Sequence, residues 1–281
     1  MTDTDIDETH LRGWIDRTET AEDLVSRRLV REFQATLDNS DDPPRPQDDA
    51  PLGIHWCLSP PTVTASRIGP DGHPMRGGFL PPVPLPRRMW AGSALQFHDR
   101  LRVDDEVRRV SVIQDVTVKH GRSGVLCFVT VRHALSTARG PALTERHDIV
   151  YRALGGPAAP KPDPASLPKP DWMRETRADP VLLFRYSAVT FNGHRIHYDR
   201  GYATGEEGYP GLVVHGPLQA TLLLQFAEEI GGRAPSNFTF RGLQPLFDFE
   251  SFRLCARRAE TGLHLWIDTA EGKQTMEAEA R

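Results

Sequence analysis

Two short segments in the second half of the chain concentrate side chains that can move protons or hold a carbonyl oxygen. Residues 191–199 read Phe-Asn-Gly-His-Arg-Ile-His-Tyr-Asp and place His194 and His197 close to Asn192. Residues 209–217 read Tyr-Pro-Gly-Leu-Val-Val-His-Gly-Pro, so His215 and Gly216 come directly before a strongly apolar stretch. Histidine titrates nearest to neutral pH, and glycine at a helix start lets a ligand oxygen approach the backbone. The two segments therefore predict acid–base chemistry on a carbonyl compound.

The chemistry that these residue types suit is reversible hydration of an enoyl thioester. A buried helix start carries unpaired N–H groups and a partial positive charge, so Gly216 is a candidate oxyanion donor. His197 would move the proton and Asn192 would position water. The alternatives are a packed histidine and a glycine that only the turn requires. The clustering of these side chains at one chain position favours a site.

The sequence lacks the motifs of nucleotide-binding loops, of serine hydrolases and of cysteine-based metal sites. There is neither a GxxxxGK[ST] phosphate loop nor a GxSxG nucleophile motif. The three cysteines, Cys57, Cys127 and Cys255, are far apart and odd in number, which argues against a disulfide framework or a zinc site. We therefore expect no metal and no other cofactor.

Composition and net charge indicate which partners and which cell compartment to expect. The chain has 281 residues and a formal net charge of −4, which gives no reason to expect nucleic acid as a partner. The acidic N-terminus lacks the features of a signal peptide, and no apolar run approaches the ~18 residues of a membrane span. We expect a cytoplasmic protein without a membrane partner.

A proline- and glycine-rich stretch, residues 70–90, should lack regular structure because proline fixes φ and removes donors. Long apolar loops are often functional. Within it, Arg87 and Arg88 lie beside Trp90 and are candidates to bind a phosphate or a carboxylate. The alternative is a pair of solvated arginines.

The first half of the chain predicts one helix followed by long strands. Apolar residues at roughly helical spacing predict a helix over residues 20–37, with Thr20 as its cap. From Leu95 to Arg152 the period falls to two, which indicates antiparallel strands. The three segments with the clearest alternation are residues 108–119, 125–133 and 145–151.

A proline-rich linker over residues 155–170 divides the chain into an N-terminal unit, 1–154, and a C-terminal unit, 171–281. The second unit predicts a strand over 181–190, a buried helix over 217–230, and four strands. Those strands are expected at 236–243, 249–258, 263–269 and 273–280. A curved antiparallel sheet wrapped on a helix is the hot-dog architecture. We predict an α+β double hot-dog in which the first unit is degenerate and the second holds the site.

The second half resembles a known superfamily, the MaoC-like and (R)-specific enoyl-CoA hydratases. The most specific part is residues 186–199, Tyr-Ser-Ala-Val-Thr-Phe-Asn-Gly-His-Arg-Ile-His-Tyr-Asp, followed by residues 209–218. Within the superfamily it is most similar to the branch of hydroxyacyl-thioester dehydratase type 2, which also holds mesaconyl-C4-CoA (3-methylfumaryl-CoA) and itaconyl-CoA hydratases. The resemblance implies a hydro-lyase of the enoyl-CoA hydratase type, most similar to those that interconvert 3-methylfumaryl-CoA and citramalyl-CoA.

The superfamily motif, Asp-x-Asn-Pro-x-His, maps its histidine onto His197 and its oxyanion glycine onto Gly216. Its acid falls on Asn192, which cannot accept a proton. Either His197 carries both proton steps, or a second acid completes the site. That acid would be Asp199 or a group from the N-terminal half. We favour His197 as the general acid/base with Asn192 orienting the water, and regard Asp199 as a structural cap.

The resemblance also implies an acyl-CoA substrate and a set of groups that bind it. Arg195 replaces the proline of the motif and is a candidate to meet a CoA phosphate or the distal carboxylate of a dicarboxylyl thioester. Arg87 and Arg88 are its rivals, and His194 and His215 complete the expected substrate-binding set. The double hot-dog either stands alone or pairs as a homodimer.

Three other functions remain open at this point. One is a (3R)-3-hydroxyacyl-thioester dehydratase of fatty-acyl chains, whose pocket would need apolar walls. Another is a non-catalytic hot-dog subunit that binds acyl thioesters, for which Asn192 is the one favourable feature. A thioesterase fits the motif less well.

Overall fold

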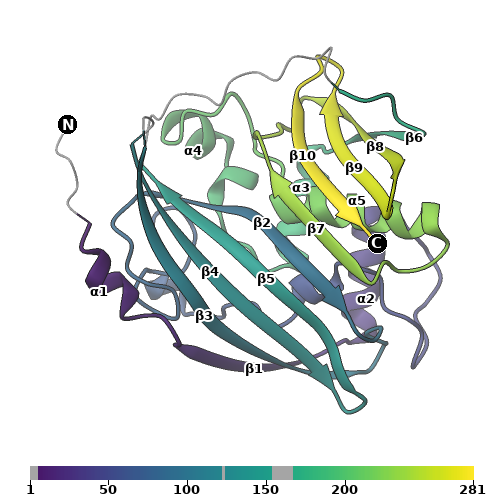
Figure 1. The fold of residues 1–281 in the computed structure, drawn as a ribbon, viewed down its shortest axis with the longest axis horizontal. Coiled ribbons are helices and arrows are strands. Elements are labelled where there is room, and N and C mark those ends of the chain that lie inside the picture. Colours follow the sequence, from purple (N-terminus) through teal and green to yellow (C-terminus); the bar gives the residue numbers. More distant parts are fainter. Residues whose placement is uncertain (1–5, 122–123, 154–166) are drawn as a thin grey trace.

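A computed structural model describes residues 6–121, 124–153 and 167–281. Its centre is helix α5 (Gly216–Gly231), which packs against the four strands that follow it in the chain (Figure 1). A helix that is apolar on nearly every side is stable only where other elements bury it all round. Gly232, with φ 65°, ends the helix in the left-handed conformation that glycine adopts without strain. The helix predicted at residues 217–230 is thus confirmed.

The four strands around α5 lie where alternation predicts them. They are β7 (Asn237–Gly242), β8 (Ser251–Ala259), β9 (Gly262–Thr269) and β10 (Gln274–Ala280). A further strand, β6 (Trp172–Arg177), pairs with β8 at the sheet edge and was not predicted. Its side chains are mostly exposed, so it lacks a buried face that would give a hydrophobic period.

The first half supplies the other five strands of one continuous antiparallel sheet. These are β1 (Thr18–Leu24), β2 (Arg87–Phe97), β3 (Glu106–Gly121), β4 (Gly124–Thr137) and β5 (Gly140–Arg152). The order across the described sheet is β1-β3-β4-β5-β2-β7-β10-β9-β8-β6. The halves join where β2 pairs with β7, with Leu95 opposite Phe238 (Figure 1). The expected strands between residues 95 and 152 are confirmed, and β2 starts earlier, at Arg87, inside the stretch expected to lack strands.

The predicted helix over residues 20–37 is wrong in its first third. Residues Thr18–Leu24 form β1, because they pair along β3 from Thr18 opposite Val112 to Leu24 opposite Glu106. The helix, α2 (Arg27–Leu37), begins after Ser26, whose hydroxyl accepts from Leu29 N at 3.1 Å. Ser26, not Thr20, is the N-cap.

The strand predicted at residues 181–190 is a helix, α3 (Pro180–Val189). Asp179 caps it by accepting from Leu182 N at 2.9 Å, and Pro180 occupies the first turn, where a missing N–H costs nothing. A short apolar run with β-branched residues cannot be assigned to strand or helix by periodicity alone. The cap and the proline were the signals that decided it.

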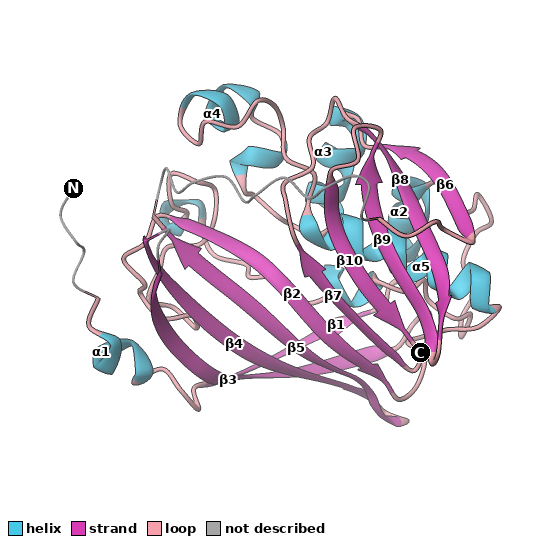
Figure 2. Cartoon of the chain, turned by 45° about the horizontal axis from the view of Figure 1, so that its top comes forward, coloured by secondary structure: helices cyan, strands magenta, loops and turns pink. Residues whose placement is uncertain are grey.

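Short helices and loops cover the rest of the sheet. Helix α1 (Glu8–Arg12) packs on β3, α2 packs on α3, and α4 (Arg200–Gly205) packs on the one-turn helix η4 (Arg195–His197) (Figure 2). Two further one-turn helices are η1 (Ile54–Cys57) and η2 (Ala65–Arg67). Most of the linker predicted at residues 155–170 lies outside the described residues, so the division into two units stays a prediction.

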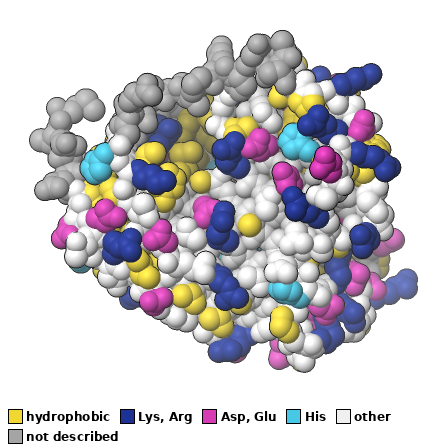
Figure 3. Space-filling model, viewed as in Figure 1, with side chains coloured by type: hydrophobic (Ala, Val, Ile, Leu, Met, Phe, Trp, Pro, Cys, Tyr) yellow, Lys and Arg dark blue, Asp and Glu magenta, His cyan; other side chains and the backbone are white. Residues whose placement is uncertain are grey.

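The core is divided in two. The larger cluster joins α5 to side chains of both halves, and the smaller one fills the space under β3, β4 and β5. The cysteines are free and buried. Among the described residues no helix is both long and apolar enough to cross a membrane. On the face shown in Figure 3, charged side chains of both signs are interspersed, and apolar side chains line a hollow.

Candidate active site

A cavity of about 1310 Å³ opens between the loops of the first half and the segment around α5. Its wall combines Arg88 and Trp90 of β2 with His197 and Gly216 of the second half. Apolar side chains make up much of the remaining lining, including Leu80, Met89, Ile149, Phe184, Phe191 and Met276. This is the shape and polarity of a small-molecule site, a concave apolar surface with a few convergent polar groups.

His197 lies at the end of η4, buried in the wall of the cavity. Its Nδ1 is 2.7 Å from the carbonyl oxygen of Val213. A carbonyl can only accept, so Nδ1 carries the hydrogen and Nε2 keeps its lone pair. Burial lowers the pKa of His197 to about 4, against the opposing effect of the Val213 bond, and the ring is neutral at pH 7. The sequence-predicted proton acceptor is therefore in the right tautomer and charge state.

His215 is placed behind His197 and does not line the described cavity. The two rings stack with centroids 3.7 Å apart, and His215 Nε2 is 2.8 Å from the hydroxyl of Ser187. His215 is completely buried, which holds its pKa far below the usual range. Its ring packs against His197 and is not part of the cavity lining, so the contacts give its predicted role in substrate binding no support.

Gly216 is the first residue of α5 and lines the cavity. The first N–H groups of a helix have no acceptor within the helix. A Cβ added at Gly216 would meet nothing within 4 Å, so the backbone here is open toward the cavity. The geometry suits an oxyanion donor, as the sequence predicted.

Asn192 also lines the cavity, half-buried after the end of α3. Its Oδ1 accepts from His194 N at 3.0 Å, which closes an Asx turn and fixes the side chain. The side-chain NH₂ is left as the group that can donate to a ligand or water. That arrangement is compatible with a water-orienting amide and excludes a role in accepting protons.

The structure does not bring Arg195 into the cavity lining. Its guanidinium donates to Asp199 Oδ2 at 3.0 and 2.8 Å and to the carbonyl of Pro70 at 3.0 Å. It also lies over the ring of Tyr202, 4.2 Å from the centroid. Asp199 in turn caps α4 by accepting from Tyr202 N. The contacts of Arg195 are thus structural, its predicted role as a substrate ligand stays a prediction, and Asp199 is the cap that the sequence suggested.

Arg87 and Arg88 both line the cavity, but only one is already neutralised. Arg87 forms an ion pair with Glu207 and lies over the ring of Tyr209. Among the described residues no carboxylate lies within ion-pair distance of Arg88. Arg88 is close enough to lower the pKa of both His73 and His194. Of the candidate arginines, Arg88 is the one placed to bind an anion.

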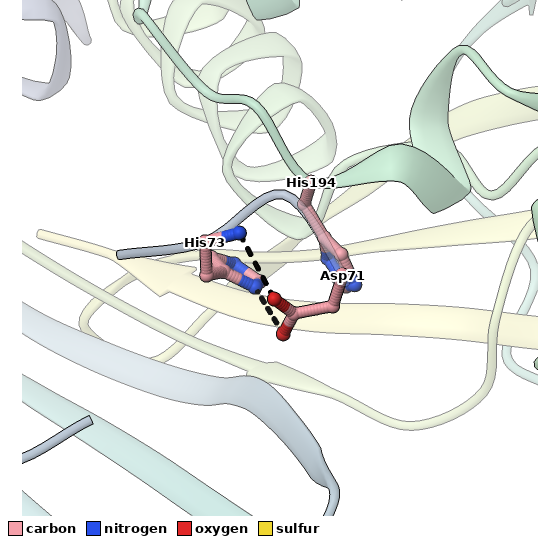
Figure 4. Close-up of side chains that lie close together, drawn as sticks. All are labelled: Asp71, His73 and His194. Atoms are coloured by element: carbon pink, nitrogen blue, oxygen red, sulfur yellow. Dashed lines mark hydrogen bonds and ion pairs between the residues drawn. The ribbon is translucent and has the colours of Figure 1, made fainter. Parts of the chain in front are cut away.

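The sequence motifs did not predict that Asp71 and His73 would lie beside His194 (Figure 4). Asp71 and His73 lie on the loop before β2, and Asp71 contacts both the backbone N and the Nδ1 of His73 at 3.0 Å. The His73 ring lies 4.1 Å from that of His194, whose ring is edge-on to His197 at 5.3 Å. His73 lines the cavity. An Asp-x-His pattern in the proline-rich stretch was the available signal.

Asp71, His73 and His194 lie close enough for one ligand atom of each to fall within 4.8 Å of the others. The contacts favour a hydrogen-bonded pair over a metal site. Asp71 is already used by His73, and Arg88 and Arg76 are near enough to His73 to oppose a cation. Although burial alone would raise the pKa of Asp71, its hydrogen bonds from His73 hold that pKa well below the usual range.

The loop that carries this pair is fastened to the second half. Arg195 N donates to the carbonyl of Asp71 at 2.9 Å, next to the Arg195–Pro70 bond. A Cβ on Gly72 would lie 1.8 Å from the carbonyl oxygen of Gly193, so only glycine permits this approach. Residues from both halves therefore build one site.

Comparisons with known proteins agree with this geometry. A family model described as hydroxyacyl-thioester dehydratase type 2 matches residues 53–248. A protein of Chloroflexus aurantiacus named mesaconyl-C(4)-CoA hydratase is 45% identical over 269 residues, 95% of each chain.

Two solved structures share the fold. One titled MaoC-like dehydratase has a TM-score of 0.72 at 16% identity and covers 96% of this chain and 99% of its own. One from Mycobacterium tuberculosis, described as a double hot-dog fold, has a TM-score of 0.58 at 13% identity with 95% of each chain covered. The double hot-dog prediction is confirmed, and the chain belongs to the hydroxyacyl-thioester dehydratase type 2 family.

Proposed function

We propose that this hydro-lyase reversibly adds water to mesaconyl-C4-CoA (3-methylfumaryl-CoA) to give citramalyl-CoA. The observation that carries the proposal is the order of groups along the cavity wall. The candidate oxyanion donor Gly216 follows His215, which stacks on His197; the His197 ring lies 5.3 Å from that of His194, and Arg88 is near enough to His194 to lower its pKa. This substrate carries its groups in the same order: thioester carbonyl, double bond, then a carboxylate on Cβ. The relative from Chloroflexus aurantiacus, named for this substrate, supports the same choice.

The reaction begins with polarisation of the thioester carbonyl by the N–H of Gly216. A donor of this kind contributes about 2.7–4 kcal/mol to other enzymes that stabilise an oxyanion. Water, oriented by the amide of Asn192, attacks Cβ as Nε2 of His197 takes one of its protons. The π electron pair moves to Cα and the carbonyl oxygen, giving an enolate. A proton added at Cα completes the hydration, and dehydration follows the same steps in reverse.

Arg88 would bind the carboxylate that distinguishes this substrate from an ordinary enoyl-CoA. A guanidinium is the best match for a carboxylate, because its planar donors can form two parallel bonds. An acyl-CoA substrate also carries phosphates. Arg87 is less suited to bind them than an unpaired cation would be, because its charge is already neutralised by Glu207.

A dehydratase of fatty-acyl chains is the second candidate, and one observation favours it. The apolar side chains of the cavity, such as Met89, Ile149 and Phe184, would also accept a hydrocarbon chain. An itaconyl-CoA hydratase differs only in the position of the double bond and shares the same carboxylate.

A panel of thioesters separates these candidates. Mesaconyl-C4-CoA, itaconyl-CoA, crotonyl-CoA and a long-chain enoyl-CoA are offered to the enzyme and to Arg88→Gln, and loss of enoyl-thioester absorbance is followed. We expect mesaconyl-C4-CoA to be preferred. Arg88→Gln should lower its kcat/KM about 10- to 100-fold, as expected for one lost ionic hydrogen bond, and leave crotonyl-CoA within about threefold. Arg88→Lys, which keeps the charge, should lose less.

Preference for crotonyl-CoA or the long chain, with equal effects of Arg88→Gln on all four thioesters, would refute the carboxylate assignment. It would leave a hydratase of simple acyl chains.

A further inference from the structure

We propose that His73, held by Asp71, is a second catalytic residue, the acid that protonates Cα. It would take the place of the acid that the wider superfamily carries where this chain has Asn192. The inference rests on the proposed hydration reaction and deepens it, because it assigns the proton that His197 alone would otherwise have to return.

The position of His73 is the first argument. It lines the same cavity as His197, and the His194 ring is near both, 4.1 Å from that of His73 and 5.3 Å from that of His197. The two histidines thus come from different halves of the molecule and reach one cavity. Groups on both sides of a double bond are what addition of water requires, one near Cβ and one near Cα.

The contact with Asp71 is the second argument. Asp71 Oδ2 accepts from Nδ1 of His73, so Nε2 is the atom left for substrate. A carboxylate in this position fixes the ring and stabilises the imidazolium, as the aspartate does in hydrolase triads. His197 has a neutral carbonyl at the matching position. His73 is therefore better suited to hold a proton, and His197 is better suited to accept one.

The mounting of the loop is the third argument. Arg195 donates to the carbonyls of Pro70 and Asp71 from 125 and 124 residues away, and Gly72 allows contact with Gly193. These contacts set the distance between the Asp71–His73 pair and the His194–His197 segment. A loop with no part in the reaction would not need so close an attachment at this point.

In the hydration direction the step balances as follows. The bond from Nε2 of protonated His73 to its hydrogen breaks, and that proton bonds to Cα of the enolate. The proton released by water bonds to Nε2 of His197 as the water oxygen bonds to Cβ. The net result is addition of water and transfer of one proton from His73 to His197. The resting state returns when that proton moves back, through His194 or solvent.

The charges around His73 link this role to the substrate. Its pKa is lowered to about 4, mainly by burial and also by Arg88 and Arg76, against the opposing effect of Asp71. The neighbouring His194 is buried and neutral. A carboxylate bound to Arg88 would cancel that positive charge and favour protonation of His73. Binding of a substrate with this carboxylate would thus favour the protonated form of His73 that the reaction needs.

The test compares His73→Gln and Asp71→Asn with the enzyme, using His10→Gln on the exposed surface as a control. Hydration of mesaconyl-C4-CoA is followed, or of whichever enoyl-CoA the enzyme hydrates fastest. We expect His73→Gln to lower kcat about 10²- to 10⁴-fold with little change in KM. Exchange of the Cα hydrogen of the product with D₂O should slow in parallel. Circular dichroism establishes that each variant is folded.

The pH profile of kcat in Asp71→Asn distinguishes an acid from a residue that only supports the fold. An acid must be protonated to act, so kcat falls as the pH rises through the pKa of His73 in the complex. Removing the carboxylate lowers that pKa, and this limb of the profile should shift to lower pH. The profile of His10→Gln should match that of the enzyme.

A folded His73→Gln that keeps kcat and Cα exchange within about threefold would overturn the proposal. So would an Asp71→Asn profile that does not shift. If the enzyme hydrates only thioesters without a carboxylate, the proposed substrate fails. The role of His73 is still decided, by the same variants on those thioesters.

Discussion

At the scale of single residues, the site depends on how each imidazole is held. His197 is fixed by its bond to Val213 and by the stacked ring of His215. His73 is fixed by a carboxylate, which favours its protonated form, whereas the carbonyl that holds His197 is neutral. Two histidines with the same ordinary pKa thus receive different roles from their partners.

Replacing His197 tests the proton acceptor. His197→Ala should lower kcat by about 10²- to 10⁴-fold, because it removes the proposed acceptor of the proton from water. His197→Asn, whose amide can still donate to Val213, should lose as much activity while keeping more of the fold. A folded variant with near-normal turnover would disprove the assignment.

The pH dependence of the enzyme tests the state of the same ring. The base works only when neutral, so activity should fall as the pH drops through its pKa. Since burial lowers that pKa to about 4, protonation of His197 should cause no fall in kcat/KM between pH 7 and pH 5. An acidic limb with a midpoint near 6.5 would show that the ring is not desolvated in solution.

A buried acid outside the site makes a separate prediction about stability. Glu145 accepts from the hydroxyl of Ser93 at 2.6 Å and from the indole N–H of Trp56, and burial raises its pKa from 4.5 to about 7. A raised carboxyl pKa stabilises the fold fully below pH 4.5, and this contribution is lost as the pH rises through 7.

Glu145→Gln removes this dependence, because an amide oxygen accepts the same bonds without ionising. On going from pH 4 to pH 8, the free energy of unfolding of the variant should rise by up to about 3 kcal/mol relative to that of the parent. The reason is that burial raises the pKa of Glu145 from 4.5 to about 7 in the parent. Urea unfolding at both pH values measures it, with the exposed Glu22→Gln as control. A constant difference between parent and variant would contradict the buried charge.

At the scale of elements, the N-terminus of α5 is the part that we propose to hold the thioester carbonyl. Its first residue lines the cavity, while the remainder of the helix is held in the core by strands of the second half. A rigid, buried helix presents its N–H groups in fixed positions, so they need no reorganisation during the reaction.

Substitutions at Gly216 test the donor directly. Gly216→Pro removes the N–H at a position where the first turn tolerates proline, and should lower kcat about 10²- to 10³-fold. Gly216→Ala keeps the N–H, and its Cβ would meet nothing within 4 Å in the protein. It should fold normally and retain more activity than the proline variant. Equal losses in both would mean that space for the substrate, not the N–H, is what Gly216 provides.

At the scale of the whole molecule, the two halves form one enzyme because their loops meet at the site. The sheet is continuous through β2 and β7, and the loop around Gly72 is fastened to the segment around Arg195. The first half supplies His73 and Arg88 to the cavity lining, together with Asp71, which contacts His73.

Gly72→Ala tests this attachment. Gly72 has φ 88° and contacts the backbone of Gly193, so a Cβ would add strain and force the loop away. We expect a loss of about 1–3 kcal/mol in the free energy of unfolding, as for a strained backbone position, and a large drop in kcat. Gly78→Ala, where a Cβ meets nothing within 4 Å, is the matched control. Normal turnover in a folded Gly72→Ala would show that the loop is not needed.

The sequence by itself determined the parts that are local. The buried helix is apolar over a long run, most strands alternate with period two, and His197 and Gly216 lie within one compact stretch of chain. Each of these signals is complete within a few turns or strands. By contrast, the sequence pattern predicts a helix over most of β1 and a strand where α3 lies, because short segments take their form from their partners.

Only the tertiary structure decided which distant groups meet. The sequence predicts Arg195 as a substrate ligand, whereas in the structure its guanidinium donates to Asp199 and to the carbonyl of Pro70. His73 and Asp71 join the site through contacts across more than a hundred residues, which no local spacing encodes. Burial set the charge states of the histidines, because desolvation depends on what packs around a ring and not on its neighbours in sequence.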